Sequence, residues 1–241
     1  MDRIIPGVHR FYSSVFAPQR TFFEMLASKQ QTPRALFITC SDSRVDPNLI
    51  TQTEPGDLFL LRNAGNIVPP YGAANGGEGA TIEYAVAVLG VKHIIVCGHS
   101  HCGAMKALFK PELYQELPAV SRWFRYAEAT RRLVTERYAD LVGAEFDRAA
   151  IEENVLVQLN NLSTHPYVTA RVARGQLHLF GWYYDIGQGL IFAYDPETGI
   201  FAPLTDMPRA TLPMVIRHHA PSCNGHGAWR NGQSVSALAT T

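Results

Sequence analysis

Two short motifs in this sequence carry side chains that bind soft metal ions. The first is C-x-D-x-R, in which Cys40 is followed by Asp42 and Arg44. The second is H-x-x-C, formed by His99 and Cys102 much later in the chain. Two thiolates and one imidazole make a ligand set that suits Zn²⁺. Three protein ligands leave a fourth position open, so the set predicts a catalytic zinc site, with one ion per chain, rather than a closed structural site.

Each of these residues alone has a simpler interpretation. A single cysteine at a strand end is usually a small buried hydrophobic side chain, and a single histidine is usually an ordinary core or surface residue. An isolated H-x-x-C is a weak indication of a metal site. The two motifs together are a stronger one, because each follows an apolar run that predicts a strand.

The elements around the motifs explain how residues so far apart can meet. Continuous apolar runs at 35–39 and 93–97 predict buried strands that end just before each motif. In an open parallel sheet, ligands bind just beyond the carboxyl ends of the strands. If these two strands are neighbours, Cys40, His99 and Cys102 converge at one edge of the sheet.

Strands and helices alternate along the rest of the chain. Further strands are predicted at 57–61, 176–184 and 190–194. Helical patterns are predicted at 8–31, 78–89, 119–140 and 148–162, and from about residue 102 onward. This alternation predicts an α/β fold with a mainly parallel central β-sheet flanked by helices.

We expect three parts: an N-terminal helical arm at 1–34, a catalytic zinc α/β domain at 35–205, and a C-terminal extension at 206–241. The arm is expected to break at Pro18, and its apolar stripe predicts packing on a second subunit. The extension has only four charged residues, so we expect it to be flexible or to dock on a partner. Its histidines and Cys223 have no convincing ligand spacing.

The composition argues against several classes of protein. The chain has 241 residues with 21 basic and 21 acidic side chains, and nucleic acid or an anionic membrane would favour a basic excess. We therefore expect neither partner. No apolar run reaches the length of a membrane span, and the N-terminus lacks the apolar core of a secretory signal. Four cysteines in a chain of this size indicate a reducing cytoplasm.

The two motifs, in this order and at this distance, resemble the signature of β-class carbonic anhydrases, and the likeness runs from about residue 20 to 195. Other stretches that match the family are Arg62-Asn63-Ala64-Gly65-Asn66, Pro69-Pro70 and Glu83-Tyr84-Ala85. Cyanobacterial members, including those of carboxysomes, are most similar at Val45-Asp46-Pro47-Asn48-Leu49 and Ala73-Ala74-Asn75-Gly76-Gly77-Glu78-Gly79. The resemblance implies zinc-dependent reversible hydration of carbon dioxide to bicarbonate and a proton, supplying CO2 for carbon fixation in photosynthesis. It places the protein in the cytoplasm, within a carboxysome.

The Asp42–Arg44 pair is expected to control the open metal position. A carboxylate this close to Cys40 could bind the metal itself, and an arginine that clamps it through two hydrogen bonds would hold it back. The family is known to use the pair in this way, with the aspartate accepting a hydrogen bond from the attacking nucleophile. The alternative is an ordinary surface ion pair.

The resemblance also implies a substrate pocket made by Gln31, Phe59, Tyr84 and the backbone N–H of Gly103. Phe59 and Tyr84 could equally be plain core residues. A second subgroup of the family, whose zinc site is closed by the aspartate, has tryptophan and glycine where this sequence has Phe37 and Thr39. We therefore expect an open zinc site. His101 and Cys97 are not expected to be ligands.

The family also implies partners. Its members are dimers or higher homo-oligomers whose N-terminal helices cross over, and the 206–241 extension is expected to dock on a carboxysome scaffold protein. Two rival functions stay open: a sister enzyme that hydrolyses carbon disulfide or carbonyl sulfide with the same ligands, and an assembly protein of a microcompartment. A nucleotide site at the glycine-rich 72–79 stretch is discounted because both phosphate-loop patterns are missing.

Overall fold

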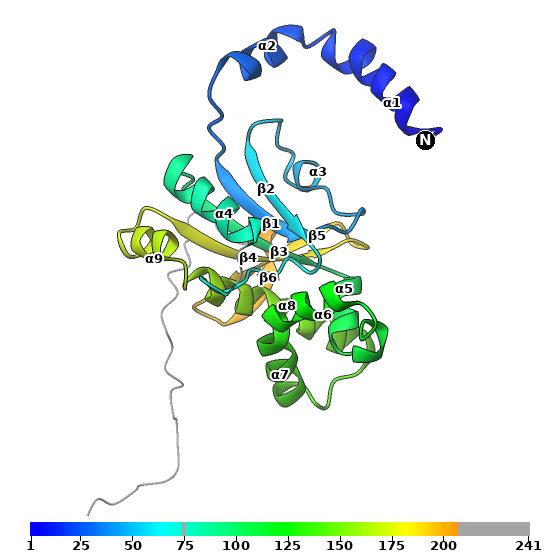
Figure 1. Cartoon of the computed structure of the whole chain (residues 1–241), viewed down its shortest axis with the longest axis vertical. Coiled ribbons are helices and arrows are strands. Elements are labelled where there is room, and N and C mark those ends of the chain that lie inside the picture. The colour runs from blue at the N-terminus through cyan, green and yellow to red at the C-terminus, as the bar shows by residue number, and fades with distance from the viewer. Residues whose placement is uncertain (74–75, 207–241) are drawn as a thin grey trace, which may run out of the picture.

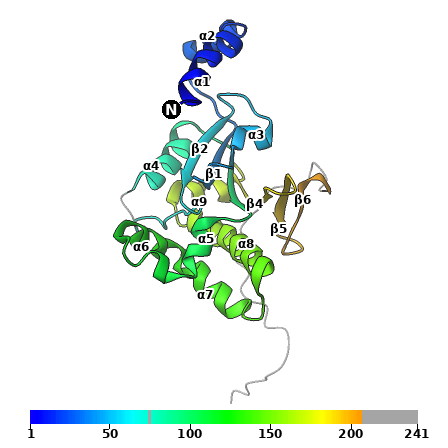
Figure 2. The ribbon, with the colours of Figure 1, turned by 90° about the vertical axis from the view of Figure 1, so that its right-hand side faces the viewer.

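The computed structural model describes residues 1–73 and 76–206 and contains one six-stranded sheet with the order β2-β1-β3-β4-β5-β6 (Figures 1 and 2). The strands are β1 Ala35–Cys40, β2 Leu58–Asn63, β3 His93–His99, β4 His178–Asp185, β5 Leu190–Asp195 and β6 Ile200–Pro203. β1 to β4 are parallel, and β5 and β6 add to them as antiparallel strands. The predicted α/β class with a mainly parallel sheet is confirmed, while the short edge strand β6 was not predicted.

Helices precede, connect and cover these strands. They are α1 Ile4–Arg10, α2 Arg20–Ser28, α3 Pro47–Thr51, α4 Gly77–Glu83, α5 Gly103–Leu108, α6 Pro118–Phe124, α7 Glu128–Arg137, α8 Gly143–Leu162 and α9 Pro166–Ala173. π-Helical turns at Phe11–Phe16 and Tyr84–Val88 prolong α1 and α4, and 3₁₀ turns lie at Pro111–Leu113, Arg125–Ala127 and Leu204–Asp206. The helical structure predicted at 119–140 is confirmed over 118–137, where the 3₁₀ turn at Arg125–Ala127 separates α6 from α7. None of the described helices is long and apolar enough to cross a bilayer.

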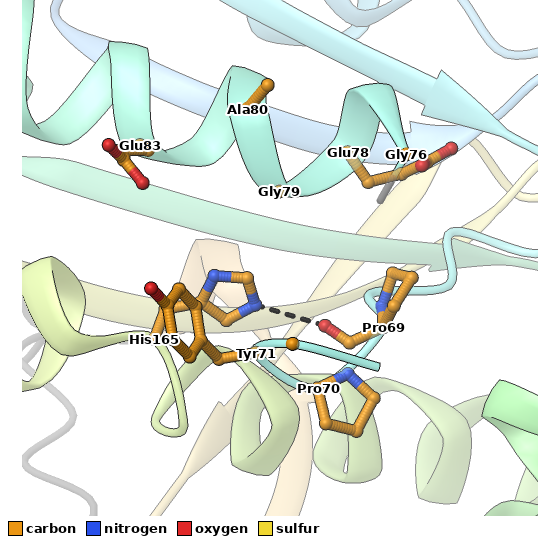
Figure 3. A pocket seen from close by; sticks show the side chains of 10 residues that line it. Pro69, Pro70, Tyr71, Gly76, Glu78, Gly79, Ala80, Glu83 and His165 are labelled. Carbon is orange, nitrogen blue, oxygen red and sulfur yellow. Dashed lines mark hydrogen bonds between the residues drawn. The ribbon is translucent and has the colours of Figure 1, made fainter. Parts of the chain in front are cut away.

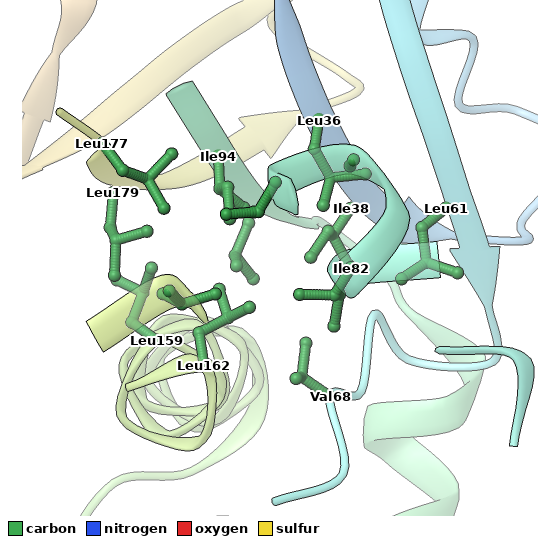
Figure 4. Packing of buried hydrophobic residues seen from close by; sticks show 14 of the residues in the cluster. Leu36, Ile38, Leu61, Val68, Ile82, Ile94, Leu159, Leu162, Leu177 and Leu179 are labelled. Atoms are coloured by element: carbon green, nitrogen blue, oxygen red, sulfur yellow. The ribbon is translucent and has the colours of Figure 1, made fainter. Parts of the chain in front are cut away.

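The main core lies on the sheet face covered by α4, α8 and α9. Alternate residues of β1 and β3, among them Leu36, Ile38 and Ile94, pack there against Leu159 and other residues of α8 (Figure 4). Two glycines let α8 approach the strands closely. A Cβ at Gly98 would lie 2.7 Å from Ile151 Cγ2, and one at Gly181 would lie 2.9 Å from Val155 Cγ1. This close packing fixes α8 directly behind the end of β3.

The opposite sheet face carries a smaller apolar cluster of Ala35, Phe37, Ile95 and Cys97. In the described part of the chain, the helix residue packed on this cluster is Ile50 of α3, and the others come from strands. Phe37 meets Trp182 edge to face, with 5.9 Å between the ring centroids.

The N-terminal arm stands away from the sheet in both views (Figures 1 and 2). Its helices cover residues 4–16 and 20–28, on either side of Pro18. No residue of α1, of the π-turn that follows it or of α2 is buried. At the other end, the predicted extension at 206–241 lies outside the described residues except for Asp206.

Candidate metal centre

Cys40, His99 and Cys102 come together at the carboxyl edge of the sheet. Cys40 ends β1, His99 ends the neighbouring β3, and Cys102 directly precedes α5. All three are buried, and their ligand atoms lie within 4.8 Å of one another. The two Sγ atoms are 3.9 Å apart. Two thiolates bound to a tetrahedral zinc ion would be separated by about 3.8 Å, so the spacing fits this ion.

His99 is oriented for metal binding by its own backbone neighbourhood. Its Nδ1 donates to the Ser100 carbonyl at 2.9 Å, which leaves the lone pair on Nε2. This Nε2 is buried and has no hydrogen-bond partner among the described residues. A buried acceptor without a partner is costly, and a metal ion at this point would satisfy it.

The two thiols influence each other's protonation strongly. The hydrogen bond from Cys102 lowers the pKa of Cys40 most, and the Gly65 N–H, 3.4 Å from Cys40 Sγ, lowers it further. The pKa of Cys102 is raised by the same contact with Cys40 and by burial. Because zinc binds thiolates, metal binding must release the proton that burial and the neighbouring sulfur favour on Cys102.

Arg44 holds Asp42 through both carboxylate oxygens. Arg44 Nε donates to Oδ1 at 2.9 Å, Nη2 donates to Oδ2 at 2.7 Å, and the Arg44 backbone N–H also donates to Oδ1 at 3.0 Å. These bonds hold the pKa of Asp42 well below its usual range. Asp42 Oδ2 lies 3.9 Å from His99 Nε2, so an ionised carboxylate faces the triad but is not part of the ligand group.

His101 is the residue that turns the chain between two of the ligands. Its φ of +57° is in the left-handed region, which residues other than glycine rarely adopt. Its carbonyl accepts a hydrogen bond from Arg44 Nη2 at 3.2 Å, while its side chain is exposed. The residue therefore shapes the site through its backbone, and it is not in the ligand group.

Of the predicted pocket residues, only Gly103 lies beside the triad in this chain. Gln31 is exposed and precedes β1, at the amino end of the strand whose carboxyl end is Cys40. Phe59 pairs with Leu36, four positions before Cys40, which corresponds to about 13 Å along the strand. Tyr84 stays with Phe59, with 6.1 Å between the ring centroids. One chain therefore does not bring these three side chains to its own metal centre.

Two further residues support the site without having been assigned a role from the sequence. Arg62 donates to the Cys40 carbonyl at 3.1 Å and to the Asp42 carbonyl at 2.8 Å, which fixes the backbone of the first motif. Gly65 donates its N–H to Cys40 Sγ. Both belong to the Arg62–Asn66 stretch. The glycine just after the end of β2 is the feature of the sequence that could have indicated a role beside the metal centre.

A separate pocket lies along α4 and contains none of the predicted site residues. Its walls include Tyr71, Glu78, Glu83 and His165 (Figure 3). His165 Nε2 donates to the Pro69 carbonyl at 3.0 Å, and Tyr71 packs edge to face on the His165 ring. His165 is thus engaged in holding the loop after β2.

Comparison with known proteins agrees with this geometry. The sequence model of the carbonic anhydrase family matches residues 35–191. A carbonic anhydrase of Synechocystis sp. is 57% identical over 196 residues, covering 81% of this chain and 71% of the relative. One of Synechococcus elongatus is 52% identical over 190 residues, covering 78% and 70%.

Solved structures show the same likeness. The β-carbonic anhydrase CcaA has a TM-score of 0.82 and 54% identity, covering 84% of this chain and 98% of that chain. A tetrameric β-carbonic anhydrase of Sordaria macrospora has a TM-score of 0.70 and 29% identity, covering 79% and 94%.

Proposed function

The chain belongs to the β-class carbonic anhydrases, which are zinc enzymes, and from this premise we propose that Cys40, His99 and Cys102 hold the ion while Asp42 and Arg44 control its open position. The observation that carries the proposal is the buried, unpartnered Nε2 of His99 beside two thiols at the spacing that zinc requires. The bound ion supplies a Lewis acid that makes water acidic enough to act as a nucleophile near neutral pH.

Asp42 orients this nucleophile in the proposed reaction. Its pKa is held far below neutral by Arg44, so the carboxylate accepts a hydrogen bond but does not carry the released proton away. Arg44 occupies both carboxylate oxygens and keeps Asp42 from taking the place of the substrate water. The backbone at Gly103 borders an open space, since a Cβ there would meet nothing within 4 Å, which leaves room for CO2 or bicarbonate.

We propose that Gln31, Phe59 and Tyr84 complete the pocket of a second copy in a homo-oligomer. Two observations support this: the three side chains lie away from their own triad, and Tyr84 is 44% exposed in the single chain. The Sordaria relative is itself tetrameric.

Mixing two inactive variants tests this sharing of residues. Cys40→Ala chains keep an intact pocket, and Tyr84→Ala chains keep an intact triad. Co-expressed chains should regain part of the wild-type activity, because mixed oligomers then contain complete sites. Activity no higher than that of the separate variants would refute the shared pocket.

The reaction itself is tested on one purified sample by measuring zinc content and CO2 hydration across pH. We expect one zinc per chain and fast hydration that rises with pH. Carbon disulfide and carbonyl sulfide are assayed beside CO2, because relatives that use these substrates share the ligand set. Hydrolysis of either, without CO2 hydration, would replace the proposed substrate.

We further propose that the enzyme supplies CO2 for carbon fixation inside a carboxysome, with the segment after Asp206 docking on a scaffold protein. The support is the identity with the two cyanobacterial relatives. Full-length protein and protein lacking residues 207–241 are compared in pull-downs with shell and scaffold proteins. Retained activity with lost capture supports docking, and unchanged capture removes the idea.

A further inference from the structure

The loop between β2 and α4 is buried although it has no regular secondary structure. Residues 65–69 are all buried. Buried backbone outside helices and strands must find hydrogen-bond partners elsewhere. In this loop the partners are largely side chains, and they converge on Gly65, the residue whose N–H donates to Cys40 Sγ.

The peptide group between Ala64 and Gly65 is held at both of its ends. At one end its N–H donates to Cys40 Sγ at 3.4 Å. At the other end its carbonyl, that of Ala64, accepts from Trp123 Nε1 in α6 at 2.9 Å. A carbonyl that accepts a hydrogen bond polarises its peptide group, which strengthens the N–H on the other side as a donor.

Asn154 of α8 fixes the next peptide group. Its Nδ2 donates to the Gly65 carbonyl at 3.0 Å. Its Oδ1 accepts from Gln158 Nε2 at 2.8 Å and from Thr130 Oγ1 at 3.0 Å, so the amide cannot rotate without losing these bonds. Asn154, Gln158 and Thr130 are fully buried, and Gln158 Oε1 also accepts from the Val68 N–H at 2.9 Å.

Gly65 has little freedom between these contacts. Its φ is +84°, and a Cβ would lie 2.9 Å from Met105 Cε and 3.2 Å from Ala104 Cβ. The glycine is thus enclosed by Cys40, by α5 and by the two side chains that hold its peptide groups.

We propose that Trp123 and Asn154 are positioning residues of the metal centre, which aim the Gly65 N–H at the thiolate of Cys40. The inference rests on Cys40 being a zinc ligand. A hydrogen bond to a ligand sulfur withdraws electron density from it and tunes the bound metal, as other groups just outside metal ligands do. Neither Trp123 nor Asn154 touches a ligand atom itself.

Cobalt substitution gives a direct readout of this hydrogen bond. Wild-type and variant proteins are loaded with Co²⁺, and the thiolate-to-cobalt charge-transfer band is recorded together with the zinc dissociation constant from chelator competition. Trp123→Phe keeps the ring and removes the N–H, and Asn154→Leu keeps the volume and removes both polar groups. Both variants should shift the band to longer wavelength, because a less hydrogen-bonded sulfur gives up charge more easily, and should weaken zinc binding about tenfold.

Matched controls separate positioning from loose packing. Tyr126→Phe removes another side-chain hydrogen bond to the same region, from Tyr126 Oη to the Ala73 carbonyl at 3.0 Å, and Tyr126 packs on Trp123. Thr130→Val removes one of the two bonds to Asn154 Oδ1, while the bond from Gln158 still fixes the amide and leaves its Nδ2 donating to Gly65. Neither control should move the band.

Two results would overturn the proposal. One is a Trp123→Phe band at the wild-type wavelength, whether or not zinc binding weakens, and the other is an equal shift in Tyr126→Phe. Trp123→Phe decides the question if Asn154→Leu does not fold. Failure of the proposed function has a different signature, because wild-type protein would then lack thiolate-to-cobalt absorption or CO2 hydration altogether.

Discussion

The carboxyl edge of the sheet and the N-terminal arm depend on their own chain to very different degrees. At the edge, Cys40, His99 and Cys102 are buried, and hydrogen bonds from the same chain orient Cys40 and His99. In the arm, Val8 is 63% and Phe11 is 45% exposed, and no helical residue is buried. The difference teaches that one chain assembles the ligand group by itself, while its arm leaves apolar side chains uncovered.

Removing one proposed ligand should abolish metal binding at the sheet edge without changing the oligomer that the arm is expected to form. Cys40→Ala is expected to lose zinc and to lower CO2 hydration to the uncatalysed rate, because two ligands do not hold the ion. Metal analysis, stopped-flow hydration and the oligomer mass by light scattering check this. Cys97→Ala is the matched control, since Cys97 is a buried thiol outside the triad, and it should retain zinc. Full zinc content in Cys40→Ala would contradict the ligand assignment.

Adding negative charge to the arm should disrupt the oligomer and leave the metal centre intact. Val8→Asp with Phe11→Asp is expected to reduce the oligomer mass and to lower activity about a hundredfold, because pocket residues of the second copy are misplaced. Zinc content should stay at the wild-type level. His9→Asp with Ser13→Asp adds the same charges to exposed polar positions nearby and should keep the mass. Loss of zinc in the arm variant would show that the two regions are not independent.

Within the edge, the Asp42–Arg44 pair should affect rate but not metal binding. Asp42→Asn is expected to lower CO2 hydration about tenfold with zinc retained, because the amide no longer offers a charged acceptor to the nucleophile. Hydration kinetics and metal content on one sample measure this. Asp57→Asn is the control, because Asp57 pairs with Arg34 at 2.9 Å away from the triad. A full rate in Asp42→Asn would refute the proposed role of the carboxylate.

The smallest effect is expected from a change in the packing between α8 and the sheet, which supports the metal centre from one side. Gly181→Ala would bring a Cβ to 2.9 Å from Val155 Cγ1 and 3.0 Å from Leu159 Cδ1. We expect a loss of about 1–3 kcal/mol in the free energy of unfolding, measured by denaturant titration, with zinc content unchanged. Gly77→Ala, where a Cβ meets nothing within 4 Å, is the control. Equal stability of both variants would show that Val155 and Leu159 can shift to accommodate the added methyl group without a measurable cost.

The sequence predicted the edge well because the physics there is local. Apolar runs define where β1 and β3 end, and the ligand types follow directly after them, so parallel pairing is enough to bring them together. Very short elements were missed because they contain too few residues to show a periodic pattern. α3 has only five residues, too few for a helical period, although Asp46 caps it by accepting from the N–H groups of Asn48 and Leu49.

Hydrogen bonds between side chains and backbone groups that are far apart in the chain have no recognisable pattern in the sequence. The roles of Trp123, Asn154 and Arg62 depend on where Ala64, Gly65 and the Cys40 carbonyl lie in space. A tryptophan or asparagine in a helix is usually read as packing or surface, and no spacing connects them to Cys40. The distance of Phe59 and Tyr84 from the triad of their own chain was equally missed, because it depends on how β2 pairs with β1 and where α4 packs.

The three proposed ligands would also act as a removable cross-link once they hold an ion. Cys40 and Cys102 are 62 residues apart in sequence, so an ion held by both closes a long loop that joins the first strand of the sheet to the start of α5. To hold the ion with both thiolates, the unfolded chain would have to close this loop at a cost of about 4 kcal/mol in entropy, by analogy with a disulfide, so the ion binds the folded chain preferentially. Resistance to denaturant should therefore depend on the free zinc concentration, and a chelator should lower the unfolding temperature. The ion that supplies the chemistry would thus also stabilise the folded enzyme against unfolding.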